Sequence, residues 1–462
     1  AKSKLTASQI KVLVNGQEQT SGITLEVTED TSVSLTYGRQ YKINISGFIS
    51  NAYQVKLVVA ANSLVDSSGN KSKEQEFILY SCLRKTDTET TATSPFLGND
   101  KIQRQKVEKI ILEDYANYTD DTRWDVSAQE DGSIIAWYET TPRNTYIVHI
   151  GSSIIMNGNE ISSYLFAYIG YDSACAETSE ESNPIIENIG LLHVDNVTTI
   201  DHMFTYFGYS NMKTFSLGKN FDVGAIQNVY EMFSYCGYKS METLDLGEKF
   251  NPKSATNMQN MFAYCGYTAM TSLDLGDNFN TTTVTNMNGM FHHTGYMKMK
   301  KLDLGENFDT KNVTDMRYMF MSCGRNAMEA LDLGDKFDTT KVTVYKEMFR
   351  GCGYQSMTRL DLGDNFNTSN GKDMSGMFQN CGVTAMTSLD LGDKFYTTSS
   401  TDMTNMFNGT GTTAMTTLDL GSGFTKIATK HDNMFTNCGN ANLVVYSPEL
   451  IYSNESAFKM GR

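Results

Sequence analysis

From about residue 200 onward, the hydrophobic positions of the chain repeat with a fixed period. The dipeptide Met-Phe marks this period nine times. Its phenylalanines are Phe204, Phe233, Phe262, Phe291, Phe320, Phe349, Phe378, Phe407 and Phe435, and seven of the eight steps between them are 29 residues long. Such self-similarity is typical of a repeat architecture, in which each unit buries its apolar face against the next unit.

Further hydrophobic columns follow the same period. Counted from each Phe, a Met recurs eight positions later, from Met212 to Met415, and a second Phe recurs 17 positions later, from Phe221 to Phe424. A partial Met column stands four positions before the Phe. These columns contain most of the 26 methionines, which indicates a repeated core rather than a store of metal or haem ligands.

Each unit is predicted to begin with a short helix. Met287, Met290 and Phe291 stand at i, i+3 and i+4, the spacing of one helix face. Thr285 is a suitable N-cap before them, and Gly295 is suited to a positive φ after them.

A short strand is predicted to follow, because Leu302-Asp303-Leu304 alternates inward and outward before Gly305. The predicted fold class is therefore an α/β leucine-rich-repeat solenoid. Its parallel strands would lie about 4.8 Å apart on one side, with short helices about 8–10 Å apart on the other.

The repeat sequence also resembles a known family. Asn312-Val313-Thr314-Asp315-Met316-Arg317-Tyr318-Met319-Phe320, followed by Leu331-Asp332-Leu333, is similar to the BspA-like leucine-rich repeats of bacterial surface proteins. Upstream, Trp124-Asp125-Val126-Ser127 and Gly132-Ser133-Ile134-Ile135-Ala136-Trp137 resemble the cap that precedes such arrays. The resemblance spans roughly residues 105–446. It implies a secreted or surface-attached adhesin, without a known ligand or catalysis.

The first 80 residues have a different pattern. The runs 10–16, 41–45, 55–59 and 76–80 are β-rich and separated by turn residues, which predicts a small antiparallel sandwich. The segment 60–72 resembles the closing hairpin of bacterial Ig-like modules. We therefore predict an Ig-like module at 1–83, a linker at 84–104, a cap at 105–190, nine repeats at 191–446, and a tail or the start of a next module at 447–462.

Charge narrows the choice of partners. With 38 basic and 53 acidic residues the chain has a formal charge of −15, which disfavours nucleic acid and anionic membranes. No run of 18 apolar residues occurs, so no membrane insertion is expected. Neither a leader nor a sorting signal is visible, and we expect the chain to be part of a longer protein.

Six of the eight cysteines occupy one repeat column, three positions after the Phe. Thr294, Thr410 and Phe207 fill the same column in other repeats, so we interpret it as a packing position with buried free thiols. Ladder disulfides or a metal site remain the alternatives. No nucleophile, zinc or phosphate-loop motif is present, and we predict that the protein is not an enzyme.

One candidate binding surface is acidic. The outward residue of the predicted strand is Asp in seven repeats, and the candidate ligand-binding or metal-binding members are Asp274, Asp303, Asp332 and Asp361. Three interpretations are open: a solvated face partly compensated by Lys, a site for divalent cations such as calcium, or a docking face for a basic partner. No other cofactor is expected.

The second candidate surface is a tyrosine column five positions after the Phe. Its members include Tyr238, Tyr267, Tyr296 and Tyr354, with Arg325 interrupting the column. Exposed tyrosines suit binding of a protein or a sugar. Alternatively, each ring closes the turn after the glycine.

Together these features predict an extracellular, cell-surface, non-enzymatic adhesin. It would bind a host or neighbouring-cell protein or glycan through the repeat array. The alternative is a structural subunit of a surface filament or layer that forms by self-association, with or without a dependence on calcium.

Overall fold

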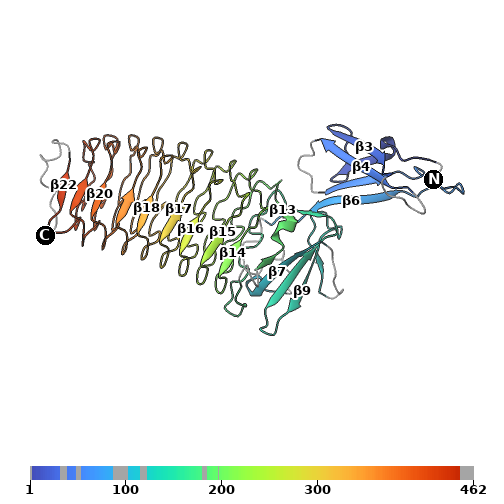
Figure 1. Ribbon diagram of the computed structural model, residues 1–462, viewed down its shortest axis with the longest axis horizontal. Coiled ribbons are helices and arrows are strands. Elements are labelled where there is room, and N and C mark those ends of the chain that lie inside the picture. Colours follow the sequence, from blue (N-terminus) through green and yellow to red (C-terminus); the bar gives the residue numbers. More distant parts are fainter. Residues whose placement is uncertain are drawn as a thin grey trace.

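The computed structural model describes residues 3–31, 39–47, 54–86, 102–114, 122–178, 185–195 and 197–447. The chain is elongated, with a β-sandwich near the N-terminus, a β-rich middle region, and a long stack of coils that leads to the C-terminus (Figure 1).

The N-terminal sandwich is antiparallel. After the short 3-10 helix η1 (Ala7–Gln9), one layer contains β1 (Ile10–Val14), β2 (Gln17–Glu18), β5 (Gln54–Val59) and β6 (Gln75–Cys82). The other layer pairs β3 (Ile23–Glu29) with β4 (Tyr41–Gly47). Strands β1, β4, β5 and β6 fall on the four predicted β-rich runs, whereas β2 and β3 were not predicted. Alternate residues such as Ile10, Val12 and Leu57 form the core between the layers. The Ig-like assignment of this sandwich remains a prediction.

A five-stranded sheet forms the middle region, in the order β12-β7-β10-β9-β8. Its strands are β7 (Val107–Glu113), β8 (Trp124–Asp125), β9 (Ile135–Thr140), β10 (Tyr146–Gly151) and β12 (Ile186–Glu187), with the 3-10 turns η3 (Arg104–Lys106) and η4 (Ile189–Leu191) at its borders.

The N-terminal sandwich and the middle region share a sheet. β6 pairs in parallel with β11 (Ile155–Asn157), which pairs in parallel with β13 (Leu192–His193). The first residues after β6 are also bonded to the middle region, because Leu83 N–H donates to Asn157 O and Arg84 N–H to Val126 O, both at 2.8 Å. The chain that leaves the sandwich is therefore anchored where the predicted linker begins.

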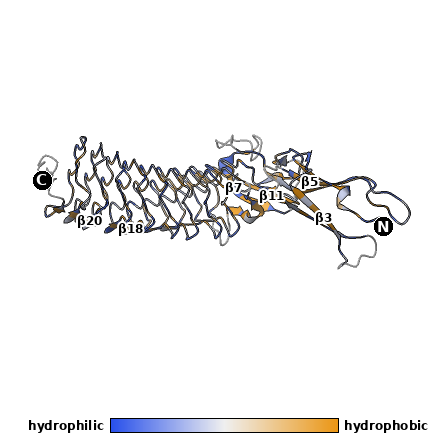
Figure 2. Cartoon of the chain, turned by 90° about the horizontal axis from the view of Figure 1, so that it is seen from above, coloured by the Kyte–Doolittle hydropathy of each residue, from blue (hydrophilic) through white to orange (hydrophobic). Residues whose placement is uncertain are grey.

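The repeats form the stack. Its strands are β14 (Thr214–Ser216), β15 (Thr243–Asp245), β16 (Ser272–Asp274), β17 (Lys301–Asp303), β18 (Ala330–Asp332), β19 (Arg359–Asp361), β20 (Ser388–Asp390), β21 (Thr417–Asp419) and β22 (Val444–Tyr446). They form small parallel sheets in the orders β14-β15, β16-β17, β18-β19 and β20-β21-β22. The offset between paired residues is 29, as in Leu273 with Leu302, except in the last pair, β21 with β22. Seen from above, the coils follow one another regularly along the long axis (Figure 2).

The predicted helices are wrong, and with them the α/β fold class. Within the described residues there is no α-helix. Where a helix was expected, turn bonds alternate with bonds to the next coil: Met290 N–H donates to Met287 O at 3.2 Å, whereas Phe291 N–H donates to Met319 O at 2.9 Å. The expected N-cap hydroxyl of Thr285 instead donates to Thr256 O of the preceding coil at 3.2 Å.

Backbone conformation explains why no helix forms. In each coil the residues two before, two after and four after the Phe have positive φ, as at Gly289 (62°), His293 (57°) and Gly295 (53°). A right-handed helix cannot continue through such residues. The i, i+3, i+4 spacing of the apolar residues is still satisfied, because successive turns bury the same side chains.

Residues 29 apart lie above one another in the core. The rings of Phe262 and Phe291 are stacked, with centroids 5.7 Å apart and planes 1° apart. The second Phe column behaves in the same way, with Phe308 and Phe337 at 6.2 Å. These side chains and the neighbouring methionines are fully buried, in one continuous core that extends into the middle region.

The cysteines are buried, as predicted for a packing column, and all eight thiols are free. However, the expected separation of 8–10 Å between neighbouring positions was wrong, because it assumed packed helices. Coils replace the helices, and the thiol of Cys236 contacts that of Cys265 in the next coil. Burial raises the pKa of Cys381 and Cys438 to about 12.

Candidate functional site

The strand-ending aspartates have a backbone role. Asp274 Oδ1 accepts a hydrogen bond from Gly276 N–H at 2.9 Å, which forms an Asx turn at the end of the strand. The same bond recurs in the other coils at 2.9–3.2 Å, at Asp245, Asp303, Asp332, Asp361, Asp390 and Asp419. Each carboxylate therefore helps to stop its own strand.

Basic neighbours engage some of these carboxylates. Lys301 Nζ lies 2.7 Å from Asp303 Oδ2 and lowers the pKa of that carboxyl, and Arg359 binds Asp361. Across the described ranges, no group of three or more His, Cys, Asp or Glu side chains could hold a metal ion. The four candidate aspartates therefore form a column and do not converge on a single ion site. They are Asp274, Asp303, Asp332 and Asp361.

The predicted tyrosine column is a continuous stack. Tyr238 and Tyr267 have centroids 4.7 Å apart, and Tyr267 and Tyr296 have centroids 4.6 Å apart. Tyr209 and Tyr171 extend the stack toward the N-terminus. Tyr354 lies beyond a gap, because the guanidinium of Arg325 occupies the position between Tyr296 and Tyr354.

A second aromatic column lies beside the first, two positions after the Phe, and was not predicted. Tyr206 and Tyr235 stack at 4.6 Å, and Tyr264 stacks with Tyr235 at 4.5 Å and with His293 at 4.6 Å. Ring centroids across the two columns are 5.5–6.3 Å apart. A period of 29 at Tyr206, Tyr235 and Tyr264 was the available sequence signal.

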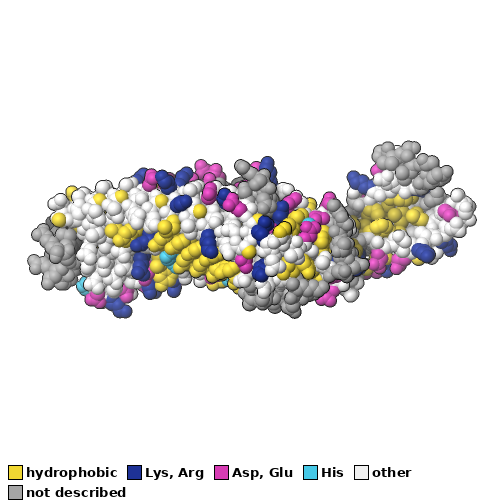
Figure 3. All heavy atoms as spheres, turned by 90° about the horizontal axis from the view of Figure 1, so that it is seen from below, with side chains coloured by type: hydrophobic (Ala, Val, Ile, Leu, Met, Phe, Trp, Pro, Cys, Tyr) yellow, Lys and Arg dark blue, Asp and Glu magenta, His cyan; other side chains and the backbone are white. Residues whose placement is uncertain are grey.

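We call the two columns together the aromatic ladder. It consists of Tyr168, Tyr206, Tyr235, Tyr264 and His293 in one column and Tyr171, Tyr209, Tyr238, Tyr267 and Tyr296 in the other. Figure 3 shows a band of hydrophobic side chains running obliquely along the stack.

The ladder presents ring edges rather than ring faces. Neighbouring rings in a column are within about 13° of parallel in most pairs, so each ring covers the face of the next. All ten rings are half-buried. Burial raises the pKa of Tyr267 to about 12, so its hydroxyl remains a protonated hydrogen-bond donor at neutral pH.

The second column places bulky residues in the left-handed backbone conformation. Tyr206, Tyr235, Tyr264 and His293 have φ of 55–58°. In the later coils the same position is held by Ser322, Gly351, Asn380, Gly409 and Asn437, also with positive φ. Gly and Asn tolerate this conformation, whereas other L-residues lose roughly 1–2 kcal/mol.

The histidines near the ladder differ in the direction of their pKa shifts. Burial lowers the pKa of His202, but hydrogen bonds to Asp201 Oδ2 (3.1 Å) and Glu231 Oε2 (3.3 Å) outweigh this effect and raise it overall. At the other end, burial lowers the pKa of His292 to about 4 and that of His293 to about 3.

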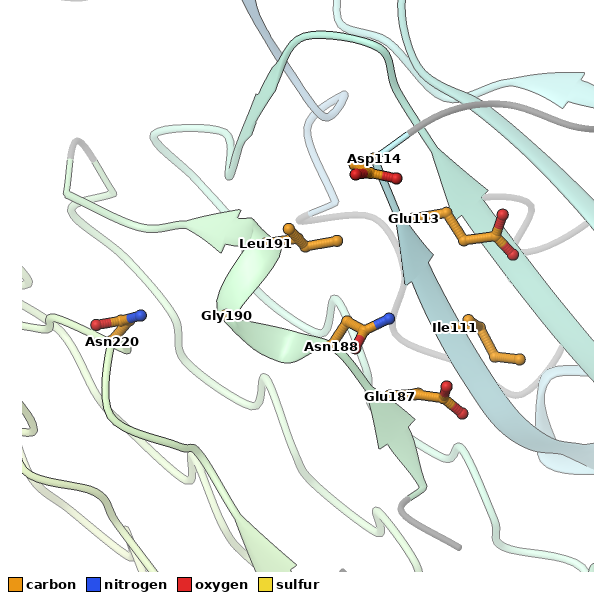
Figure 4. Close-up of a pocket in the computed structure, with 8 residues that line it drawn as sticks. All are labelled: Ile111, Glu113, Asp114, Glu187, Asn188, Gly190, Leu191 and Asn220. Atoms are coloured by element: carbon orange, nitrogen blue, oxygen red, sulfur yellow. The ribbon is translucent and has the colours of Figure 1, made fainter.

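A cleft of about 670 Å³ lies where the middle region meets the first coils. Figure 4 shows its lining residues, namely Ile111, Glu113, Asp114, Glu187, Asn188, Gly190, Leu191 and Asn220. Glu113 Oε1 lies 2.7 Å from His149 Nδ1, and Glu187 lies 2.7 Å from Lys109. Among the described residues, the lining contains the carboxylates of Glu113, Asp114 and Glu187 and no Ser, Cys or Lys side chain.

The fold and the ladder define a repeat protein built from stacked 29-residue β-coils with an aromatic face. Residues 174–267, 258–389 and 325–447 match the family described as "Mycoplasma protein of unknown function, DUF285", and the chain belongs to this family. No curated protein matches the chain, and no solved structure matches it either. Among the described residues, no helix has the length and apolar character needed to cross a membrane.

Proposed function

We propose that the protein is a non-catalytic adhesin, and that its repeat stack binds a partner protein through the aromatic ladder. The observation that carries this proposal is the use of strained Tyr and His residues in the second column. Tyr206, Tyr235, Tyr264 and His293 occupy a backbone position that later coils fill with Ser, Gly or Asn. Strained residues persist where the surrounding structure or a function requires them.

The core does not require these rings. Phe378 and Phe407, in coils that lack the second aromatic column, stack at 5.5 Å, much as Phe233 and Phe262 stack at 5.4 Å within the ladder. The rings therefore extend the surface of the stack and are not needed for the packing of its core. Tyrosine is enriched at the centres of protein interfaces, because it offers a rigid apolar body and a polar tip.

Ring geometry favours a protein over a glycan. The C–H groups of a sugar are attracted to the open, electron-rich face of an aromatic ring. In the ladder these faces are covered by the neighbouring rings, as between Tyr235 and Tyr264. The exposed ring edges and hydroxyls suit apolar side chains and main-chain carbonyls of a polypeptide.

We infer an extracellular location from the resemblance to bacterial surface repeats. The free thiols are compatible with this location. Burial raises the pKa of every thiol in the Cys column for which a shift is resolved, as at Cys352, and a buried, protonated thiol reacts slowly with oxidants.

Selection of phage-displayed random peptides on the full chain tests the proposal. We expect clones whose affinity falls at least tenfold on the double variant Tyr235→Asn/Tyr264→Asn. The matched control is Tyr396→Ser, which removes an exposed tyrosine outside the ladder and should leave binding unchanged. A screen that yields no clones, or only clones that bind all three proteins equally, would refute the proposal. A parallel glycan array with ladder-dependent hits would replace the protein partner by a glycan.

A further inference from the structure

We infer that Arg325 anchors a carboxylate of the partner, and that the ladder therefore selects an extended acidic polypeptide segment. This inference rests on the proposed function and specifies the chemistry of the ligand. Its basis is Arg325, whose positive charge is not paired with a carboxylate of any described residue.

Arg325 differs from the other arginines of the stack. Within residues 197–447, Arg317 binds Asp315 at 2.8 Å, Arg350 binds Glu347 at 2.6 Å, and Arg359 binds Asp361. Arg325 makes neither an ion pair nor a side-chain hydrogen bond with any described residue, and its guanidinium packs against the rings of Tyr296 and Tyr354. In a chain with a net charge of −15, such an arginine is exceptional.

The guanidinium of Arg325 is nevertheless held in place. Its central carbon lies 4.0 Å from the ring centroid of Tyr354 and 5.9 Å from that of Tyr296. Gly351 makes room for it, because a Cβ at this position would lie 2.5 Å from Arg325 Nη1 and 3.1 Å from Ser322 Oγ. A stacked guanidinium is pre-organised for bidentate binding of a carboxylate, since little side-chain entropy remains to be lost.

A second cation lies near the other end of the ladder. Lys239 Nζ lies 5.4 Å from the ring centroid of Tyr209, and the side chain has no ion pair with the described residues. Lys239 leans back toward the coil of Tyr209, whereas Arg325 lies against Tyr354. The coils of the two residues are three steps apart and Lys239 leans back by up to one more, so the two charges are separated by three to four coil steps of about 4.8 Å, or roughly 14–19 Å.

This separation fits one class of ligand. An extended polypeptide advances about 3.3 Å per residue, so carboxylates about four to six residues apart would reach both cations. The intervening residues would lie over the edges of Tyr238, Tyr267 and Tyr296. Two isolated cations with ring edges between them suit a peptide better than a sulfated glycan, which needs a continuous basic strip.

The test uses a fluorescein-labelled peptide, Gly-Glu-Thr-Val-Tyr-Val-Thr-Glu-Gly, and a matched peptide with Gln in place of both Glu. Fluorescence anisotropy with the full chain at low ionic strength measures the two dissociation constants. We expect the Glu peptide to bind roughly tenfold more tightly than the Gln peptide. Arg325→Gln should remove this preference, whereas Arg359→Gln, a control at an arginine already paired with Asp361, should preserve it.

Each other outcome has a defined meaning. Equal binding of the two peptides, an unchanged preference in Arg325→Gln, or no saturation of either peptide up to about 1 mM would overturn the acidic-segment inference. If binding of both peptides is lost in Tyr235→Asn/Tyr264→Asn while Arg325→Gln has no effect, the proposed function survives and only the role of Arg325 fails. If the ladder variant binds both peptides like the unmodified chain, the proposed function itself fails. Tighter, Arg325-dependent binding of heparin would replace the peptide by a sulfated glycan.

Discussion

The two halves of the stack share a core but differ in their surface. In the aromatic half, which comprises the coils of Phe204 to Phe291, neighbouring core Phe rings are 5.4–5.7 Å apart, and in the polar half, the coils of Phe320 to Phe435, they are 5.2–5.5 Å apart. Equivalent inter-coil bonds also match: Tyr235 N–H donates to Ala263 O at 2.8 Å, and Asn380 N–H donates to Asn408 O at 2.8 Å.

The difference lies in what the left-handed backbone positions two residues after each Phe carry. The polar half fills them mostly with Gly and Asn, which adopt this conformation at little cost. The aromatic half fills them with Tyr and His and gains a ladder of rings. Comparison of the halves thus separates what the coil needs in order to fold from what has been added to its surface.

The largest expected effect tests whether the core is the same in both halves. Phe262→Ala and Phe378→Ala each remove a fully buried ring, and each should lower the free energy of unfolding by about 3–5 kcal/mol. Urea denaturation followed by circular dichroism measures the loss. If the free energy of unfolding lost in one variant is less than half of that lost in the other variant, the two cores are not equivalent.

A smaller effect is expected at the shared glycines. Gly266 and Gly382, one in each half, have φ of 53° and 52°, and an added Cβ would lie 2.5 Å and 2.6 Å from a Met Cβ. Their replacement by Ala should destabilise the protein by about 2–4 kcal/mol. The control Gly276→Ala has a φ of 75° and open space, and should cost only about 1 kcal/mol. Equal losses at Gly266 and Gly276 would mean that crowding at the methionine is unimportant.

The pH dependence of stability should distinguish the two ends of the aromatic half. The pKa of His202 is raised in the folded state, so its stabilising contribution is complete below its unfolded pKa of about 6.5 and is lost as the pH rises through the folded value. The pKa values of His292 and His293 are lowered to about 4 and about 3. The stabilising contribution of these two histidines is therefore present above pH 6.5 and declines as the pH falls toward 4.

Denaturation between pH 5 and 8.5 measures both effects. His202→Asn should remove the loss on the alkaline side, and His292→Asn/His293→Asn should recover about 1–2 kcal/mol per histidine at pH 5. A stability profile of the unmodified chain that is flat over this range would contradict both assignments.

Periodicity made much of the fold predictable. The 29-residue step led to the parallel strand register, the Phe and Met core, and the tyrosine column of Tyr238, Tyr267 and Tyr296. The helices were wrong because apolar residues at i, i+3 and i+4 are buried equally well by successive turns. Gly289 and Gly376, two positions before the Phe, were the signal that a positive φ is needed there.

The site was less predictable than the fold. An aspartate two residues before a glycine, as at Asp274 and Gly276, indicates an Asx turn, and this interpretation of the acidic column was available from the sequence. Arg325 could be seen only as a break in the tyrosine column. Its guanidinium stacks on Tyr354 and has no carboxylate partner among the described residues. Both features depend on side chains from three coils, which periodicity alone cannot place.

The most direct test of the account compares stability and binding in one variant, Tyr235→Asn/Tyr264→Asn, which gives two aromatic positions the residue type of the polar half. Lost ring stacking costs about 0.5–1.5 kcal/mol per pair, and relief of the left-handed strain returns a similar amount. We therefore predict a free energy of unfolding within about 1 kcal/mol of the unmodified chain and a loss of at least tenfold in affinity for ladder-selected peptides. A variant that loses several kcal/mol of stability but binds those peptides as tightly per folded molecule would show that the rings support the fold and not a partner.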